Sequence, residues 1–187
     1  MGFHTFSLER ADSLDDPARY RFCSREELLE LLDPEPTDHV MDIGSGTGFF
    51  TADVAPFVGA LAAVDVQSGM HRHFAREGIP ANTQPVTCGI SALPFVDDAF
   101  DHAFSVDTHH EYYSDVAMSE LARTIRPSGR LVTIDWAANG SGEAGPPLEE
   151  RYTPAEIVTH LESAGFEIAQ RRERPETVAI TAVRNPS

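Results

Sequence analysis

The chain has 187 residues, enough for one domain of ordinary size with a three-layer core, and its composition is that of a globular protein. It carries 30 acidic residues against 14 basic ones, its net charge is −16, and it offers no basic stripe for nucleic-acid phosphates. The two cysteines, Cys23 and Cys88, lie far apart and suggest neither a disulfide framework nor a metal site. We therefore predict no nucleic-acid partner and no metal site.

The acidic composition without any lysine is typical of proteins that fold in a salty cytoplasm, and it resembles that of haloarchaeal proteins. Strong self-repulsion destabilises a compact state at low salt, and concentrated salt screens it. The N-terminal sequence turns acidic at once and has no apolar signal core, and no apolar run approaches the ~20 residues of a membrane helix. We predict a halophilic, cytoplasmic protein with an acidic surface and no membrane partner, either a monomer or a homodimer.

In chain order, the first 37 residues are predicted to form a helical cap. Within it, Ser24 is an N-cap residue in front of apolar residues at helical spacing over 24–32. The prolines of 33–38 end that helix, because proline cannot continue one. A short apolar strand is predicted at 39–43.

From this strand onward, strands and helices alternate. The pattern predicts strands at 39–43, 60–66, 83–89, 102–107, 130–136, 166–173 and 177–184, and helices at 49–58, 68–77, 115–125 and 153–165. Ser68 and Thr153 are the expected caps of two of these helices. The proline in the third strand indicates an edge position. Residues 137–150 are predicted to be a flexible lid loop, and the last two strands a hairpin.

This alternation predicts an α/β fold, since strands that alternate with short helices form a mostly parallel sheet covered on both faces. We expect a three-layer αβα sandwich with a Rossmann-like, seven-stranded sheet whose last strand is antiparallel. Residues 1–187 show no internal repeat and no linker, so they are predicted to form a single domain. Its parts are the helical cap (1–37), a core (38–136), and a C-terminal part (137–187) with the lid loop, a helix and the closing strands.

Three glycines at alternate positions, Gly44, Gly46 and Gly48, follow the strand that carries Asp42. Ligands of such sheets lie outside the carboxyl ends of the strands, and glycines there let the backbone approach them. A phosphate-binding loop needs a lysine, which the chain lacks. The dinucleotide fingerprint of NAD-dependent oxidoreductases needs a glycine or alanine where Phe49 stands.

The pattern apolar-x-Asp-x-Gly-x-Gly-x-Gly resembles the first motif of the class I methyltransferases that use S-adenosylmethionine. Three further segments fall where that family has them: Asp65 at the end of the second strand, "LPFVDDAFD" at 93–101, and "RPSGRLVTIDW" at 126–136. The resemblance is close over about residues 38–136 and rests on topology elsewhere. It implies S-adenosylmethionine as the cofactor and 38–136 as the cofactor-binding core.

The resemblance also implies roles for single residues. Asp42 would hold the methionine amino group, and Asp65 would accept hydrogen bonds from the ribose hydroxyls. Further contacts would come from Gly44, Ser45, Gly46 and Thr47 to the methionine and ribose, from Val66 and Ile90 to the adenine, and from Val106 to the methionine side. Gly89 stands where related proteins place an acid that bonds the adenine amino group, so adenine recognition is predicted to be weaker there.

The segment "SVDTHHEYYSD" at 105–115 follows the fourth strand, where the acceptor should meet the methyl group. His109 and His110 are candidate general bases near neutral pH. The segment lacks the Asn/Asp-Pro-Pro-Tyr motif of DNA and protein amide methylation, and the chain lacks the several cysteines of arsenic methylation. We therefore predict a small-molecule acceptor.

Other aromatic and histidine residues have two interpretations each. In the cap, His4, Phe6, Tyr20 and Phe22 either line the acceptor pocket or pack within the cap. His71 and His73 are interpreted as solvated helix residues rather than metal ligands, because their spacing points the two rings to different helix faces.

Two functions stay open. The first is S-adenosylmethionine-dependent methyl transfer to a small-molecule acceptor. The alternative is a non-catalytic S-adenosylmethionine-binding module that acts through a protein partner, with the missing adenine acid at Gly89 as the mark of lost turnover.

Overall fold

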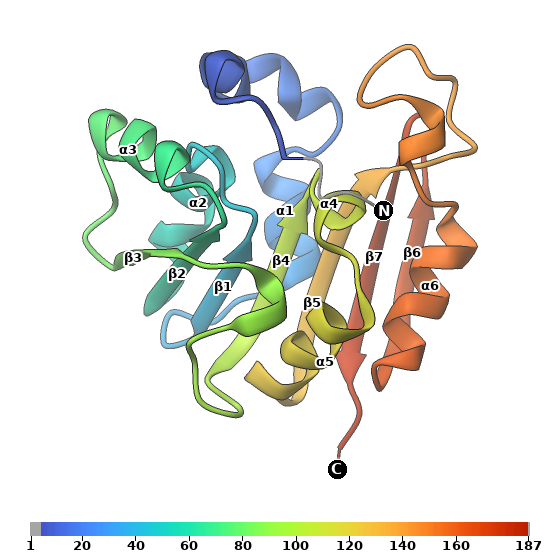
Figure 1. Ribbon diagram of the computed structural model, residues 1–187. Coiled ribbons are helices and arrows are strands. Elements are labelled where there is room, and N and C mark those ends of the chain that lie inside the picture. Colours follow the sequence, from blue (N-terminus) through green and yellow to red (C-terminus); the bar gives the residue numbers. More distant parts are fainter. Residues whose placement is uncertain (1–4, 187) are drawn as a thin grey trace.

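The computed structural model, which describes residues 5–186, contains one seven-stranded sheet in the order β3-β2-β1-β4-β5-β7-β6 (Figure 1). The strands are β1 (His39–Ile43), β2 (Ala60–Asp65), β3 (Thr83–Thr87), β4 (Phe100–Val106), β5 (Ile125–Trp136), β6 (Phe166–Glu173) and β7 (Thr177–Arg184). Neighbours from β3 to β5 pair in parallel, and β7 runs antiparallel to both β5 and β6. The predicted sheet is confirmed.

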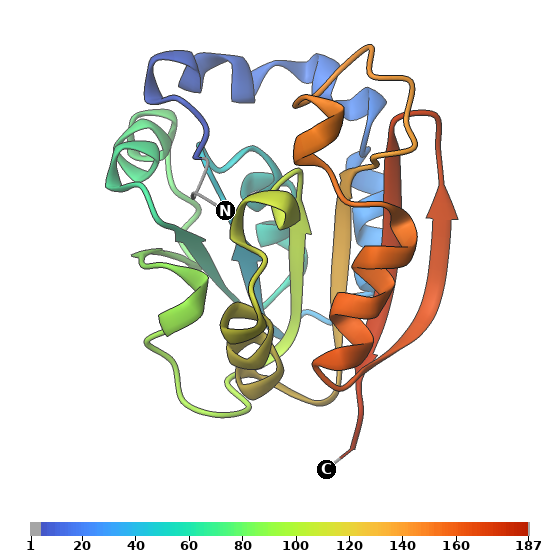
Figure 2. The same cartoon turned by 45° about the vertical axis from the view of Figure 1, so that its right-hand side comes forward.

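Helices cover both faces of the sheet, which confirms the three-layer sandwich (Figure 2). Their bounds are α1 (Arg25–Leu32), α2 (Phe49–Val54), α3 (Ser68–Glu77), α4 (His109–Tyr112), α5 (Asp115–Thr124) and α6 (Pro154–Ser163). Buried residues of α1, α2 and α3 form one cluster with the sheet, and buried residues of α4, α5 and α6 form another.

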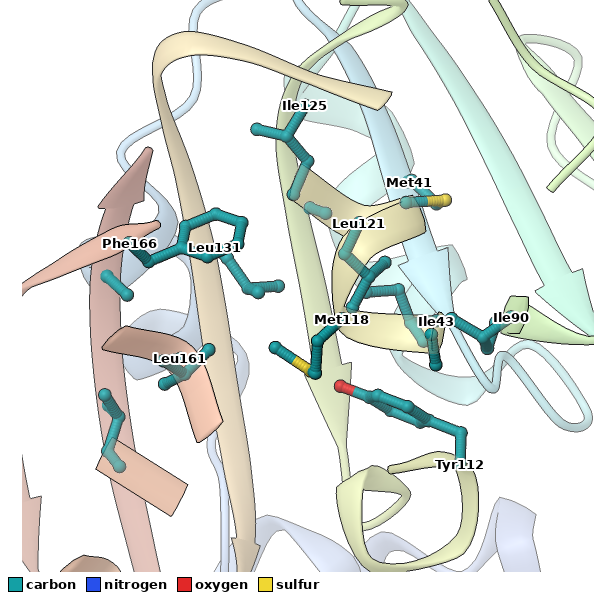
Figure 3. Packing of buried hydrophobic residues seen from close by; sticks show 14 of the residues in the cluster. Met41, Ile43, Ile90, Tyr112, Met118, Leu121, Ile125, Leu131, Leu161 and Phe166 are labelled. Atoms are coloured by element: carbon teal, nitrogen blue, oxygen red, sulfur yellow. The ribbon is translucent and has the colours of Figure 1, made fainter. Parts of the chain in front are cut away.

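Alternation along β1 divides its side chains between these two clusters, because successive strand residues point to opposite faces. Val40 packs on the α1 and α2 side, whereas Met41 and Ile43 pack on the α5 side. In the second cluster Tyr112 of α4 lies beside Met118 of α5 and Ile43 (Figure 3). This packing ties the short helix α4 to the core and so fixes the segment that follows β4.

Two of the three predicted helix caps are confirmed. Ser24 Oγ accepts the Glu27 N–H at 3.2 Å, and Thr153 forms a capping box with Glu156. The prediction for Ser68 is wrong, since Ser68 is already the first residue of α3 and Gln67 occupies the cap position. The Asp65 carboxylate accepts the Gln67 N–H at 2.7 Å, so this side chain, not Ser68, fixes the entry into α3.

Several element boundaries differ from prediction. Strands β4 and β5 begin earlier, because Phe100 pairs with Ile125 before an irregularity in register. The predicted helix 49–58 is α-helical only to Val54 and continues as the 3₁₀ turn Ala55–Phe57. Pro56 stands within that turn and has no N–H to donate to an α-helical bond.

The N-terminal segment crosses the carboxyl ends of the strands as two 3₁₀ helices, Leu8–Asp15 and Pro17–Arg21 (Figure 1). The helix α1 that follows packs into the core instead, with Leu28 and Leu32 fully buried. Within residues 5–186, no helix combines the length and the apolar character that a bilayer span requires.

Candidate active site

A cavity of about 560 Å³ opens at the carboxyl ends of the central strands. It lies around β1, where the strand order reverses between β2 and β4, the place at which open α/β sheets bind ligands. Residues from 5–22 and from 145–150 complete its wall from above. Its volume is that of a site for a small organic ligand.

The glycine loop forms the floor of this cavity. Gly44, Gly46 and Gly48 all have positive φ, at 73°, 55° and 86°. A Cβ on Gly44 would lie 2.7 Å from Thr108, and one on Gly48 would lie 2.3 Å from the Phe74 ring. These two positions therefore require glycine both for conformation and for packing.

Asp65, at the end of β2, holds the same loop. Its carboxylate accepts the N–H groups of Gly46 at 2.9 Å and of Gln67 at 2.7 Å. Burial raises the pKa of this carboxyl, and the two N–H groups oppose that rise. The side chain also lines the cavity, so a ligand hydroxyl can reach it.

Asp42, in β1, is only 4% exposed and lines the cavity from below. Its Oδ2 accepts the Thr51 hydroxyl at 2.5 Å. Burial raises its pKa to about 7 despite that bond. A buried acid with one neutral partner favours the approach of a cation, which would stabilise its ionised form.

Most of the residues predicted for the site come together here. The cavity is lined by Asp42, Gly44, Ser45, Gly46, Asp65, Val66, Gly89, Ile90, Val106 and His110. A Cβ on Gly89 would meet no atom of the described residues within 4 Å, so the space at this position is open. Two predicted residues, Thr47 and His109, are not part of the wall.

Thr47 and His109 make contacts elsewhere. The Thr47 hydroxyl donates to Asp15 of the N-terminal segment at 2.6 Å. His109 is fully buried, and its Nε2 lies 3.1 Å from Nδ1 of His160 in α6. Burial lowers the pKa of His109 to about 4. These contacts make His109 a neutral brace between α4 and α6.

His110, the next residue, turns to the cavity and binds Asp135. Its Nδ1 lies 2.8 Å from Oδ1 of Asp135, and its backbone N–H donates to Oδ2 at 2.7 Å. Burial works against the charged ring, but the fully buried Asp135 outweighs it, so the pKa of His110 is raised. Asp135 is absent from the predicted residues, although it stands, like Asp42 and Asp65, near the end of a buried strand.

The N-terminal segment adds further wall residues. Phe6 and Phe22 line the cavity, which is one of the two interpretations given for them, and the Phe22 ring packs on Trp136 with centroids 4.6 Å apart. Tyr20 instead bonds Asp53 outside the cavity at 2.9 Å, and His4 lies outside the described residues. Arg19 also lines the cavity, 3.3 Å from Asp107, and nothing in the local sequence pattern signals this pair.

The predicted lid loop contributes to the cavity wall, and a buried ion pair lies at its base. Arg151 binds Glu176 at 3.0 Å and donates to the carbonyl of Pro146 at 2.8 Å. Glu176 also accepts the backbone N–H groups of Gly142 and Glu143. These bonds fix the path of 137–151, and the Arg151 guanidinium lies 5.4 Å from the Trp136 ring.

The interpretation of His71 and His73 as solvated residues is wrong. His71 is buried behind the glycine loop, with its ring 3.4 Å from Ser45 Oγ and 3.0 Å from Thr87 Oγ1. His73 Nε2 lies 2.7 Å from Asp15 Oδ2. Both rings connect α3 to the segments that build the cavity.

Comparison with known proteins agrees with this geometry. Residues 41–133 match the model of a family described as a methyltransferase domain. The chain is 37% identical over 107 residues to the biotin biosynthesis bifunctional protein BioHC of Cellvibrio japonicus, covering 54% of this chain and 21% of that protein. It is 29% identical over 115 residues to a demethylmenaquinone methyltransferase of Corynebacterium kroppenstedtii, covering 60% and 48%. The chain thus spans less than half the length of either relative.

Among solved structures, a SAM-dependent methyltransferase from Aquifex aeolicus superposes with a TM-score of 0.88 at 27% identity. That likeness covers 96% of this chain and 99% of the other. The sheet order, the glycine loop with Asp42 and Asp65 beside the cavity, and these matches together place the chain among the class I methyltransferases, whose cofactor is S-adenosylmethionine.

Proposed function

We propose that this protein transfers the methyl group of S-adenosylmethionine to a small-molecule acceptor, with His110 as the general base. The observation that carries the proposal is the His110–Asp135 pair at the wall of the cavity. Because Asp135 occupies Nδ1, the ring holds its proton there, and the lone pair of Nε2 remains for the proton of an acceptor.

The glycine loop and the carboxylates of the cavity are suited to S-adenosylmethionine. Gly44 and Gly46 line the cavity with backbone atoms, so a ligand can contact the loop backbone there. Asp65 would bind the ribose hydroxyls, and Asp42 would face the methionine amino group. Ser45, Thr47 and Val106 would support the methionine part, with Thr47 acting through the loop, and Val66, Gly89 and Ile90 would border the adenine. When bound, the cofactor supplies an electrophilic methyl group on a positively charged sulfur.

The acceptor half lies between His110 and the aromatic pair of Phe22 and Trp136. Pro146 and Pro147 line this half with apolar surface, which would reduce the access of water to the acceptor. The protein then contributes mainly position and electrostatics to the reaction, and a base where the acceptor must lose a proton.

A small acceptor agrees with a cavity roofed by residues 5–22 and 145–150. The named relatives include a demethylmenaquinone methyltransferase, and we extend to this chain only the class of small organic molecules. The net charge of −16 supports the absence of a nucleic-acid partner and a halophilic, cytoplasmic setting with an acidic surface. We also propose that residues 1–187 act as a single domain.

The test is conversion of methyl-labelled S-adenosylmethionine to S-adenosylhomocysteine in molar KCl, with a fractionated pool of small metabolites as acceptors. We expect turnover by the wild type and loss of at least a hundredfold in His110→Ala with unchanged cofactor affinity. Binding without turnover in every fraction would instead support the non-catalytic module that acts through a protein partner.

A further inference from the structure

The cavity wall beside His110 carries the carboxylate of Glu111. Glu111 lines the cavity and is partly buried, and no described side chain or backbone group donates a hydrogen bond to its carboxylate. The acids of the cofactor half differ from it, since Asp42 has Thr51 and Asp65 has two backbone N–H groups. A partly buried carboxylate without a protein donor relies on solvent for its hydrogen bonds, and a ligand with a donor can take the place of that solvent.

Asp107, on the same segment, shows the same shortage of donors. Its Oδ2 pairs with Arg19, whereas its Oδ1 is buried and has no hydrogen-bond partner within residues 5–186. The residue has a φ of 61°, which is uncommon outside glycine and is held here by the bond from its N–H to the Ile134 carbonyl at 2.8 Å.

The charge of the cavity lining also favours a positively charged ligand. Five carboxylates line it, from Asp42, Asp65, Asp107, Glu111 and Glu150, against the guanidinium groups of Arg10 and Arg19. Burial raises the pKa of Glu111 to about 7 and that of Asp107 to about 6. The single net positive charge of the cofactor leaves this surplus of acids uncompensated.

We propose that the methyl acceptor is a small amine and that Glu111 binds its nitrogen beside His110. This inference rests on the proposed function and names its substrate class. An ammonium group supplies both the positive charge and the N–H donors that the wall lacks. A carbonyl compound such as an oxidised quinone supplies neither.

The chemistry balances for such an acceptor. The ammonium first gives one proton to Nε2 of His110, which frees the lone pair of the nitrogen. The nitrogen then forms a bond to the methyl carbon while the carbon–sulfur bond breaks, and that electron pair goes to the sulfur. The N-methylated product keeps one positive charge, and the charge of the sulfonium remains as the proton on His110.

Three ligands, the cofactor and two of its analogues, test the role of Glu111 before any acceptor is known. S-Adenosylhomocysteine has neither charge nor donor at the transfer position, S-adenosylmethionine has charge without a donor, and sinefungin carries an amine there. We expect Glu111→Gln to weaken the binding of sinefungin at least tenfold in calorimetric titration. The binding of the other two ligands should weaken by no more than threefold. The matched control is Glu150→Gln, which removes a carboxylate from the cavity rim and should leave all three affinities within threefold.

The outcomes separate the two proposals. Retained S-adenosylhomocysteine affinity in Glu111→Gln shows that the variant is folded. Equal losses for sinefungin and S-adenosylmethionine, or the same loss in Glu150→Gln, would mean that Glu111 acts only through its charge and would overturn the amine assignment. Unchanged sinefungin affinity would overturn it as well. No binding of S-adenosylhomocysteine to the wild type would overturn the proposed function itself.

Discussion

Oδ1 of Asp135 lies 2.8 Å from Nδ1 of His110, and Oδ2 of the same carboxylate accepts the His110 backbone N–H at 2.7 Å. One buried side chain at the end of β5 therefore fixes both the position of α4 and the orientation of the ring. Charge and geometry act together, because the carboxylate that orients the imidazole also raises its pKa.

The first prediction concerns this pair. In Asp135→Asn the ring loses its charged partner, so the pKa of His110 should fall from above its usual value to below it. The measurement is a pH titration of the His110 ring by NMR, which needs no acceptor. Exposed His39 serves as an internal control, and its ring signals should be the same in the wild type and the variant. An unchanged His110 titration would contradict the assigned role of Asp135.

The second prediction concerns the cofactor. Asp65→Ala should weaken the binding of S-adenosylmethionine and of S-adenosylhomocysteine at least tenfold, because charge-assisted hydrogen bonds contribute about 1.5–3 kcal/mol each. Calorimetric titration in molar KCl measures both. Asp97→Ala removes an exposed carboxylate far from the cavity and should bind as the wild type does. Unaltered affinity in Asp65→Ala would remove the ribose assignment.

The third prediction concerns acid stability. His109 has a folded-state pKa of about 4 against an ordinary value of 6.5, so between these values the unfolded chain binds more protons. This contribution is fully present above pH 6.5 and is lost as the pH falls toward 4. By pH 5 the loss should amount to about 2 kcal/mol of unfolding free energy.

Urea unfolding of wild type and His109→Gln at pH 7.5 and pH 5 measures this effect. Carboxylates with raised pKa values act in the opposite direction, and comparing the two proteins cancels their part. The variant should be less stable at pH 7.5 but lose less stability on acidification. Equal losses in both proteins would show that His109 does not remain neutral in the folded state.

The fourth prediction concerns salt. With a net charge of −16 the folded state should be lost at low ionic strength and recovered in molar KCl, because screening weakens the repulsion between carboxylates. Circular dichroism across a KCl series follows the transition. Sucrose at matched osmolality is the uncharged control and should not replace the salt. A signal that stays constant across the series would assign the acidic surface another purpose.

Features made by contiguous residues could be predicted from the sequence. The glycine loop, Asp42 and Asp65 follow from two strand-to-helix turns, because a short turn places its own residues against the ligand. Caps such as Ser24 and Thr153 are equally local. Features made by distant residues could not. Arg19 and Asp107 pair at the cavity wall although 88 residues separate them, and Arg151 and Glu176 pair at the base of the 137–150 loop although 25 residues separate them.

The order of strands and helices and the place of the cofactor loop were determined by the sequence alone, since period and turn chemistry act over a few neighbouring residues. Only the tertiary structure decided between His109 and His110. Successive residues of a helix point about 100° apart, so one ring faces the cavity and the other faces the core. The histidine that faces the cavity is decided by the packing of α4 against Asp135 of β5 and His160 of α6. Those contacts span 25 and 51 residues of chain.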